Sequence, residues 1–178
     1  MRNNKKGFTL VELLATIVIL AIVMLVGISA VGPIMANSRK SALKSDGVDL
    51  MNAAKTAYQA EAMTNSPAFQ PNQSICFDIK WLVAKGYAEN KNNYWASVLV
   101  KYDNTDNKNQ YTYTYWIGNK TYDFLAASGN TDYEKAANHD DSDANKAKLQ
   151  KCGAESTKNY DLYCTVGTDG KEDCSATL

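Results

Sequence analysis

An uninterrupted apolar segment near the N-terminus constrains the fold of this 178-residue chain more than any other feature. The segment Leu13–Val31 has nineteen residues and no charged side chain. About 20 apolar residues are enough to cross a bilayer as an α-helix. In lipid the helix also satisfies the backbone hydrogen bonds of the segment. We therefore expect a membrane-spanning helix here.

Gly27, Gly32 and Pro33 predict a kink or a loosened stretch within residues 27–33.

The orientation of this helix follows from the cysteines rather than from the flanking charges. Basic residues precede and follow the apolar segment, so the positive-inside rule does not decide. All four cysteines come after it, and an even number beyond a membrane-crossing element is typical of disulfides formed outside the cytoplasm. The cysteine spacing lacks the paired ligands of a zinc site, and we expect no metal. The cysteines are Cys76, Cys152, Cys164 and Cys174.

Four cysteines allow three pairings, and four free thiols remain the alternative. The segment Thr168-Asp169-Gly170 is typical of a turn and lies between the last two cysteines. This favours a bond between Cys164 and Cys174, which leaves Cys76 with Cys152.

Glu12 is the one formal charge between Phe8 and Ser38. A carboxylate in a membrane helix costs about 2.5–3.5 kcal/mol on insertion scales. Near the membrane edge Glu12 can reach towards water, and this is one interpretation. The other is that it pairs with a cation formed later. A cut between Gly7 and Phe8 would place a new amino group one helical turn before Glu12.

The N-terminal residues are also specific as a motif. A basic leader ends in Lys5-Lys6-Gly7, the segment Phe8–Leu14 follows, and the apolar run continues from there. This pattern resembles the prepilin signature shared by type IV pilins, type II secretion pseudopilins and competence pilins. The resemblance implies cleavage after Gly7 by a prepilin peptidase, N-methylation of Phe8, and pairing of Glu12 with the N-terminus of a neighbouring subunit.

The same resemblance implies partners and a location. The precursor would sit in the cytoplasmic membrane, and an assembly ATPase with membrane platform proteins would polymerise it into an extracellular pilus with other pilin subunits, including minor pilins. No cofactor is implied. The expected organisation is a cleaved leader (1–7), a hydrophobic anchor and assembly half of the helix (8–37), and a globular head (38–178). Pro33 lies later than the proline of many family members.

Beyond the anchor, the pattern predicts an α+β head. Apolar and small residues between 38 and 63 fall on one helical arc, so the helix from Phe8 is expected to reach about residue 63 and pack on the head. A short helix is expected over 76–86, and strands over 95–102, 111–117 and 121–126. The polar tail predicts a helix within 132–151 and a strand at 160–164. The result is a long N-terminal helix packed on an antiparallel sheet.

Several function classes are disfavoured. With 19 basic and 19 acidic residues, the chain lacks the positive charge that nucleic-acid binding needs. The acidic stretch after His139 starts like a calcium loop, but Lys146 and Cys152 stand where that loop needs glycine and glutamate, so a solvated loop is favoured. His139 has no recognisable catalytic partner, and we expect it on the surface. Tyr111, Tyr113 and Tyr115 alternate as in ordinary sheet packing.

We therefore expect no catalytic residues and a structural subunit of a type IV pilus. A pseudopilin of a secretion or competence machine is the alternative within this class. A signal-anchored surface enzyme or binding protein is the alternative from another class.

Overall fold

The computed structural model describes residues 9–64, 69–70, 72–104, 110–128, 136–153 and 160–176. The chain divides into two compact units, Met1–Arg39 and Lys40–Leu178. One helix, α1 (Leu10–Met63), contributes its first part to the first unit and its second part to the second. The two units are described separately below.

The described part of the first unit is an apolar helix with exposed side chains. Every large apolar side chain between Leu10 and Met35 is 49–82% exposed. An 18-residue window of α1 has a mean hydropathy of 2.9, so the helix is long and apolar enough to cross a membrane by length and composition. The expected loosened stretch at residues 27–33 is not found, because α1 continues through Pro33, whereas a kink at this place stays a prediction. A proline removes one backbone donor, and the turns on both sides keep theirs.

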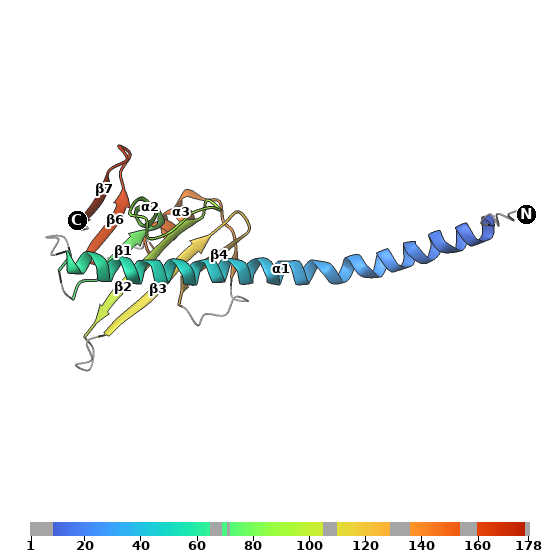
Figure 1. The fold of residues 1–178 in the computed structure, drawn as a ribbon, viewed down its shortest axis with the longest axis horizontal. Coiled ribbons are helices and arrows are strands. Elements are labelled where there is room, and N and C mark those ends of the chain that lie inside the picture. The colour runs from blue at the N-terminus through green and yellow to red at the C-terminus, as the bar shows by residue number, and fades with distance from the viewer. Residues whose placement is uncertain are drawn as a thin grey trace, which may run out of the picture. The chain divides into compact units, whose positions relative to one another are not determined.

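The second unit, the head, contains a seven-stranded sheet with the order β5-β4-β3-β2-β1-β6-β7 (Figure 1). Only the pair β1·β6 is parallel, and the other neighbours in the sheet are antiparallel. The strands are β1 (Ile75–Asp78), β2 (Trp95–Asp103), β3 (Gln110–Gly118), β4 (Tyr122–Ala127), β5 (Ala137–Asn138), β6 (Leu162–Val166) and β7 (Glu172–Ala176).

The predicted α+β class is confirmed, and the sheet is mixed rather than wholly antiparallel. The central meander β2-β3-β4 matches the three predicted strands to within one residue at each end. The parallel pair arises because the chain returns late, after α3 (Asp143–Gln150), and adds β6 beside β1. A return of this kind depends on contacts between distant parts of the chain.

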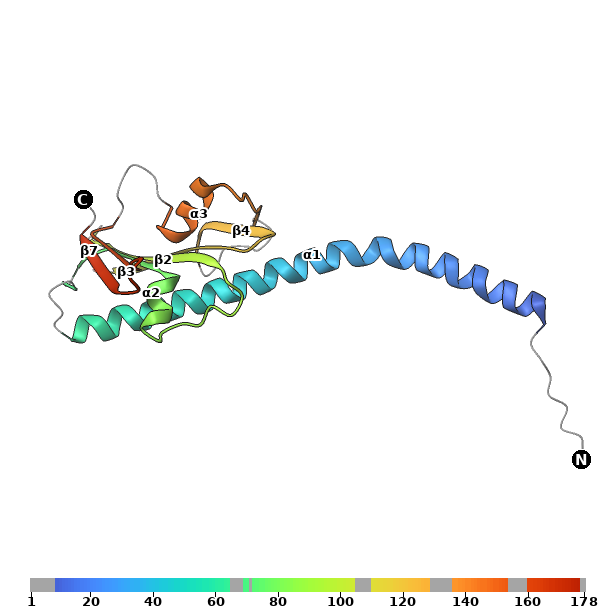
Figure 2. The same ribbon diagram turned by 90° about the horizontal axis from the view of Figure 1, so that it is seen from above.

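Helices cover both faces of the sheet (Figure 2). The head part of α1 and the short helix α2 (Ile79–Ala84) lie on one face, and α3 lies on the other. The apolar arc predicted for residues 38–63 is confirmed, because it supplies the side chains of α1 that are buried in the main core. These are Leu43, Leu50, Ala54, Ala57 and Tyr58.

The segment that begins at Cys76 differs from the prediction. Residues 76–78 belong to the fully buried strand β1, and the helix begins only at Ile79. Asp78 separates the two elements, since its backbone is extended and its side chain accepts a hydrogen bond from the Lys80 amide as the N-cap of α2. Gly86, with φ of +77°, follows the helix as predicted.

Two disulfides join the four cysteines in the same pairs that the sequence analysis favours. Cys76 in β1 is bonded to Cys152, which follows α3, and Cys164 in β6 is bonded to Cys174 in β7. In the tail, α3 lies within the predicted range 132–151, and β6 overlaps the predicted strand 160–164. The segment Asn65-Ser66-Pro67, whose residue types are typical of a loop, lies outside the described residues.

Candidate functional site

The N-terminal motif lies partly outside the described residues. Gly7 and Phe8, the predicted cleavage and methylation positions, belong to the undescribed part. Glu12 lies in the first turn of α1. The structure therefore describes the surroundings of the Glu12 carboxylate but not those of Gly7 and Phe8.

Glu12 and Thr9 close a capping box at the start of α1. The Glu12 Oε2 atom accepts hydrogen bonds from the Thr9 amide at 2.9 Å and from the Thr9 hydroxyl at 2.8 Å. The Thr9 Oγ1 atom in turn accepts from the Glu12 amide at 3.3 Å. A helix begins with backbone amides that have no partner within the helix, and this exchange satisfies two of them.

The capping box fixes where the carboxylate of Glu12 points. The Thr9 amide and the Thr9 hydroxyl both donate to one oxygen, Oε2, which therefore points towards the start of the helix. The other oxygen, Oε1, has no hydrogen-bond or ion-pair partner among the described residues, so it can accept a cation. A negative side chain at this end of a helix is also favoured by the partial positive charge of the free amides.

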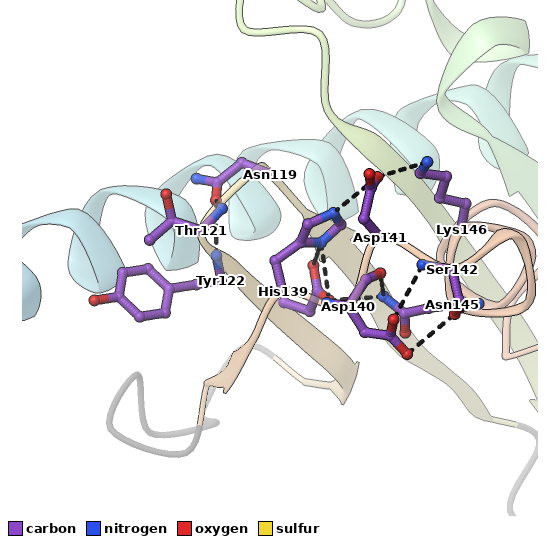
Figure 3. A network of polar contacts seen from close by, with 10 residues as sticks. Asn119, Thr121, Tyr122, His139, Asp140, Asp141, Ser142, Asn145 and Lys146 are labelled. Carbon is purple, nitrogen blue, oxygen red and sulfur yellow. Dashed lines mark hydrogen bonds and ion pairs between the residues drawn. The ribbon is translucent and has the colours of Figure 1, made fainter.

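His139 has a different environment from the predicted one. Its side chain is only 7% exposed, and its Nδ1 atom lies 2.9 Å and 3.2 Å from the two carboxylate oxygens of Asp123. Figure 3 shows His139 beside Asp140 and Asp141 in a network of polar contacts. Its ring stacks flat on Trp95, with 5.1 Å between the centroids. The prediction of a surface histidine is therefore wrong. The reason is that β4 and β5 pair and bring together residues that are 16 positions apart.

Asp123 is the centre of this polar network. It is 1% exposed and also accepts hydrogen bonds from the Asn145 side-chain amide at 2.8 Å and from the Asp140 backbone amide at 3.3 Å. One buried carboxylate thus connects β4, the end of β5 and the first turn of α3. Such a charge is tolerated in an interior because its acceptor sites are used.

The outer side of the network faces solvent. Asp141 is 80% exposed, lies 2.6 Å from the Lys146 ammonium, and has a lowered pKa because Lys146 donates to it. The Nε2 atom of His139 is enclosed and 3.7 Å from Asp141. Because Nε2 is closed off from solvent, the pair of His139 and Asp123 is suited to a structural role, which is to hold β4 and β5 together. Within the described ranges, no group of three or more acidic, histidine or cysteine side chains is placed to hold a metal.

The tyrosine pattern of β3 belongs to the packing of the sheet, as predicted. Tyr115 is fully buried, and Tyr111 and Tyr113 pack partly buried against the same core. Tyr58 of α1 donates a hydrogen bond to the Tyr111 hydroxyl at 3.0 Å. The aromatic row therefore joins the helix to the sheet.

Sequence reasoning missed two kinds of residue at these positions. Thr9 was not recognised as a cap, although a threonine three residues before a glutamate at the start of an apolar run is the capping-box pattern. Asp123 and Asn145 carry no local signal, because their roles depend on the pairing of β4 with β5 and on the docking of α3.

The comparisons with known proteins give one match. Searches of curated proteins and of solved structures found no match. A family model described as the prokaryotic N-terminal methylation motif matches residues 2–28. The match includes Gly7, Phe8 and Glu12 as well as most of the apolar segment. Residues 2–28 of this chain thus carry the signature of type IV pilins and pseudopilins.

Proposed function

We propose that this chain is a structural subunit of an extracellular type IV pilus. The observation that carries the proposal is the methylation motif at residues 2–28, placed on a helix whose large apolar side chains are at least 49% exposed up to Met35. Such a surface requires lipid before assembly and other copies of the helix after it.

The proposal assigns a role to each part of the chain. A prepilin peptidase removes residues 1–7, and the amino group of Phe8 becomes N-methylated. Residues 8–37 hold the subunit in the cytoplasmic membrane and then form the filament core with neighbouring pilins. Residues 38–178 form the head on the filament surface. An assembly ATPase and membrane platform proteins drive the transfer.

The closest alternative is a pseudopilin of a type II secretion or competence machine. The two disulfides of the head support a location outside the cytoplasm for either kind of subunit, because periplasmic and extracellular domains both keep such bonds. A signal-anchored surface enzyme is the alternative from another class, and it would keep residues 1–7.

Mass spectrometry of filaments sheared from the cell surface tests the proposal. We expect a chain that starts at a methylated Phe8, and a Gly7→Leu variant that keeps its leader and stays out of the filaments, because a bulky residue before the cut does not fit where glycine does. Met1 retained on exported protein would refute it. Correctly cut protein that occurs only in the envelope would favour the pseudopilin.

A further inference from the structure

Two charged residues on the head part of α1 lie on opposite flanks of the helix. The buried stripe of α1 contains Leu43 and Leu50. At about 100° per residue, Lys44 lies about 100° to one side of Leu43, and Asp49 lies about 120° to the other. They are five positions apart, whereas side chains meet along a helix at three or four positions. Lys44 and Asp49 of one chain are therefore poorly placed to pair with each other.

Asp49 lies at the wall of a groove in the head. The groove has a volume of about 400 Å³ and runs between α1 and the segment 87–94. Its lining includes three carboxylates, one ammonium and several apolar or aromatic side chains. The carboxylates are Asp46, Asp49 and Glu89, the ammonium is Lys91, and the remaining lining includes Leu50, Ile79, Tyr87, Tyr94 and Ile117.

Two of the three carboxylates have partners within the head. Asp46 accepts a hydrogen bond from the Tyr94 hydroxyl. Burial of this tyrosine, with Asp46 beside it, raises the pKa of Tyr94 to about 12, so the hydroxyl keeps its proton at neutral pH. Glu89 forms an ion pair with Lys91. Asp49 has neither a hydrogen-bond nor an ion-pair partner among the described residues, and it is exposed.

Lys44 is the complementary group. Its neighbour Lys40 already has a place within the head, with its ammonium 5.1 Å from the centre of the Tyr122 ring. Lys44 has no ion pair with any residue that the structure describes, although it lies one turn further along the same helix. A lysine combines an apolar stem with a terminal charge. These two parts match the apolar floor and the acidic wall of the groove.

We infer that Lys44 of a second copy of this chain enters the groove and pairs with Asp49. This inference rests on the proposed function. Because the two groups lie on opposite flanks, each subunit presents Lys44 to one neighbour and Asp49 to another. The contact is therefore head-to-tail, and it propagates along a filament instead of closing a dimer.

The spacing of the two charges agrees with the pairing proposed at the N-terminus. A neighbour whose Phe8 amine lies level with Glu12 is shifted by four residues, or about 6 Å along the helix. The same shift of four residues brings the neighbour's Lys44 level with residue 48, next to Asp49. Counted in residues along α1, the same offset of four positions thus serves both charge pairs.

Charge reversal in cells that assemble the filament tests the inference. We expect Lys44→Glu and Asp49→Lys to reduce incorporation of the subunit at least several-fold, since each places like charges at the contact. The double variant Lys44→Glu/Asp49→Lys should restore incorporation to near the native level. Lys101→Glu is the matched control, because this exposed lysine on β2 receives the same change of charge away from the groove. All variants are first checked for equal amounts of cut precursor.

A second experiment does not depend on tolerance of reversed charges. In filaments that carry Lys44→Cys together with Asp49→Cys, a short bismaleimide cross-linker should give a ladder of linked multimers, whereas each single cysteine variant should give none. A cross-linker is used because a direct disulfide is shorter than the span of a lysine–aspartate pair. Three results would each overturn the contact. They are normal incorporation of the single charge-reversal variants, a double variant whose incorporation does not recover, and the absence of a ladder. The proposed function fails separately, if native chain is missing from the filaments.

Discussion

At the scale of single residues, Gly47 shows how closely α1 approaches the sheet. A Cβ atom at this position would lie 2.3 Å from the ring of Tyr115, which is fully buried. Separations this short do not occur between unbonded carbon atoms, so either the helix or the ring must move. The glycine thus permits the close contact between helix and sheet on which the core of the head depends.

We predict that Gly47→Ala destabilises the head. Overpacking costs about 1–3 kcal/mol, and alanine recovers about 1 kcal/mol through its better helix propensity. The free energy of unfolding, measured by urea denaturation of the full chain in detergent, should therefore fall. Gly32→Ala is the matched control, because its Cβ would meet nothing within 4 Å. A stabilised Gly47→Ala variant would contradict the close contact.

Asp123 is the second residue whose removal has a defined consequence. Asp123→Ala leaves the His139 ring, the Asn145 amide and the Asp140 backbone amide without their common acceptor. Because an unsatisfied buried donor costs about 1–3 kcal/mol, we expect a loss of at least about 2 kcal/mol in the free energy of unfolding. Asp141→Ala, at a site that is 80% exposed, should change it much less, because exposed ion pairs contribute little to stability. Equal effects of the two substitutions would show that the buried network does not hold these elements together.

At the scale of elements, the spacing of apolar residues predicts those helices and strands whose conformation depends on their own local sequence. The arc from Leu43 to Tyr58 has helical spacing, and it is buried as expected. The run Ile75–Phe77 is apolar at every position, and short runs of this kind fit a buried strand as well as a helix. The prediction of a helix failed there because pairing with β2 and β6 decides between the two.

The edge strand β7 and the His139 network were outside the reach of sequence reasoning. The residues Glu172–Ala176 include no large apolar side chain, and their strand conformation follows from pairing with β6 and from the bond between Cys164 and Cys174. The environment of His139 depends in the same way on strand pairing. Local sequence therefore predicted the central meander and left the outer strands open.

The two disulfides are expected to contribute unequally to stability. The bond Cys76–Cys152 spans 76 residues and the bond Cys164–Cys174 spans 10. In the chain-entropy model these loops correspond to about 4.5 and about 2.7 kcal/mol. Replacing the first pair by serine should therefore lower the urea midpoint more than replacing the second. The opposite order would show that the hairpin β6-β7, rather than the link from β1 to the end of α3, limits the stability of the head.

At the scale of the whole molecule, the chain combines a helix that needs partners with a head that has its own core. The first unit exposes its apolar side chains, while the second buries its own on both faces of the sheet. A substitution in the first unit can therefore change assembly without affecting the packing of the head. Glu12 is the residue at which this separation can be measured.

We predict that Glu12→Ala reduces incorporation into filaments while the head stays folded. Among helices packed in a filament, a carboxylate needs a cation, and the proposed amino group at Phe8 is the nearest one along the chain. Alanine makes the segment more apolar and leaves that amine without its partner, so docking should weaken although membrane insertion improves. Thr9→Ala is an informative companion, because it removes both hydrogen bonds of the Thr9 hydroxyl in the capping box and keeps the charge of Glu12. If Thr9→Ala is incorporated and Glu12→Ala is not, the charge pair matters rather than the helix cap.

The measurement is a count of the filaments that contain each variant, at equal amounts of cut precursor. Normal incorporation of Glu12→Ala would mean that Glu12 only reaches towards water at the membrane edge, and that the register between subunits is set by contacts between their heads.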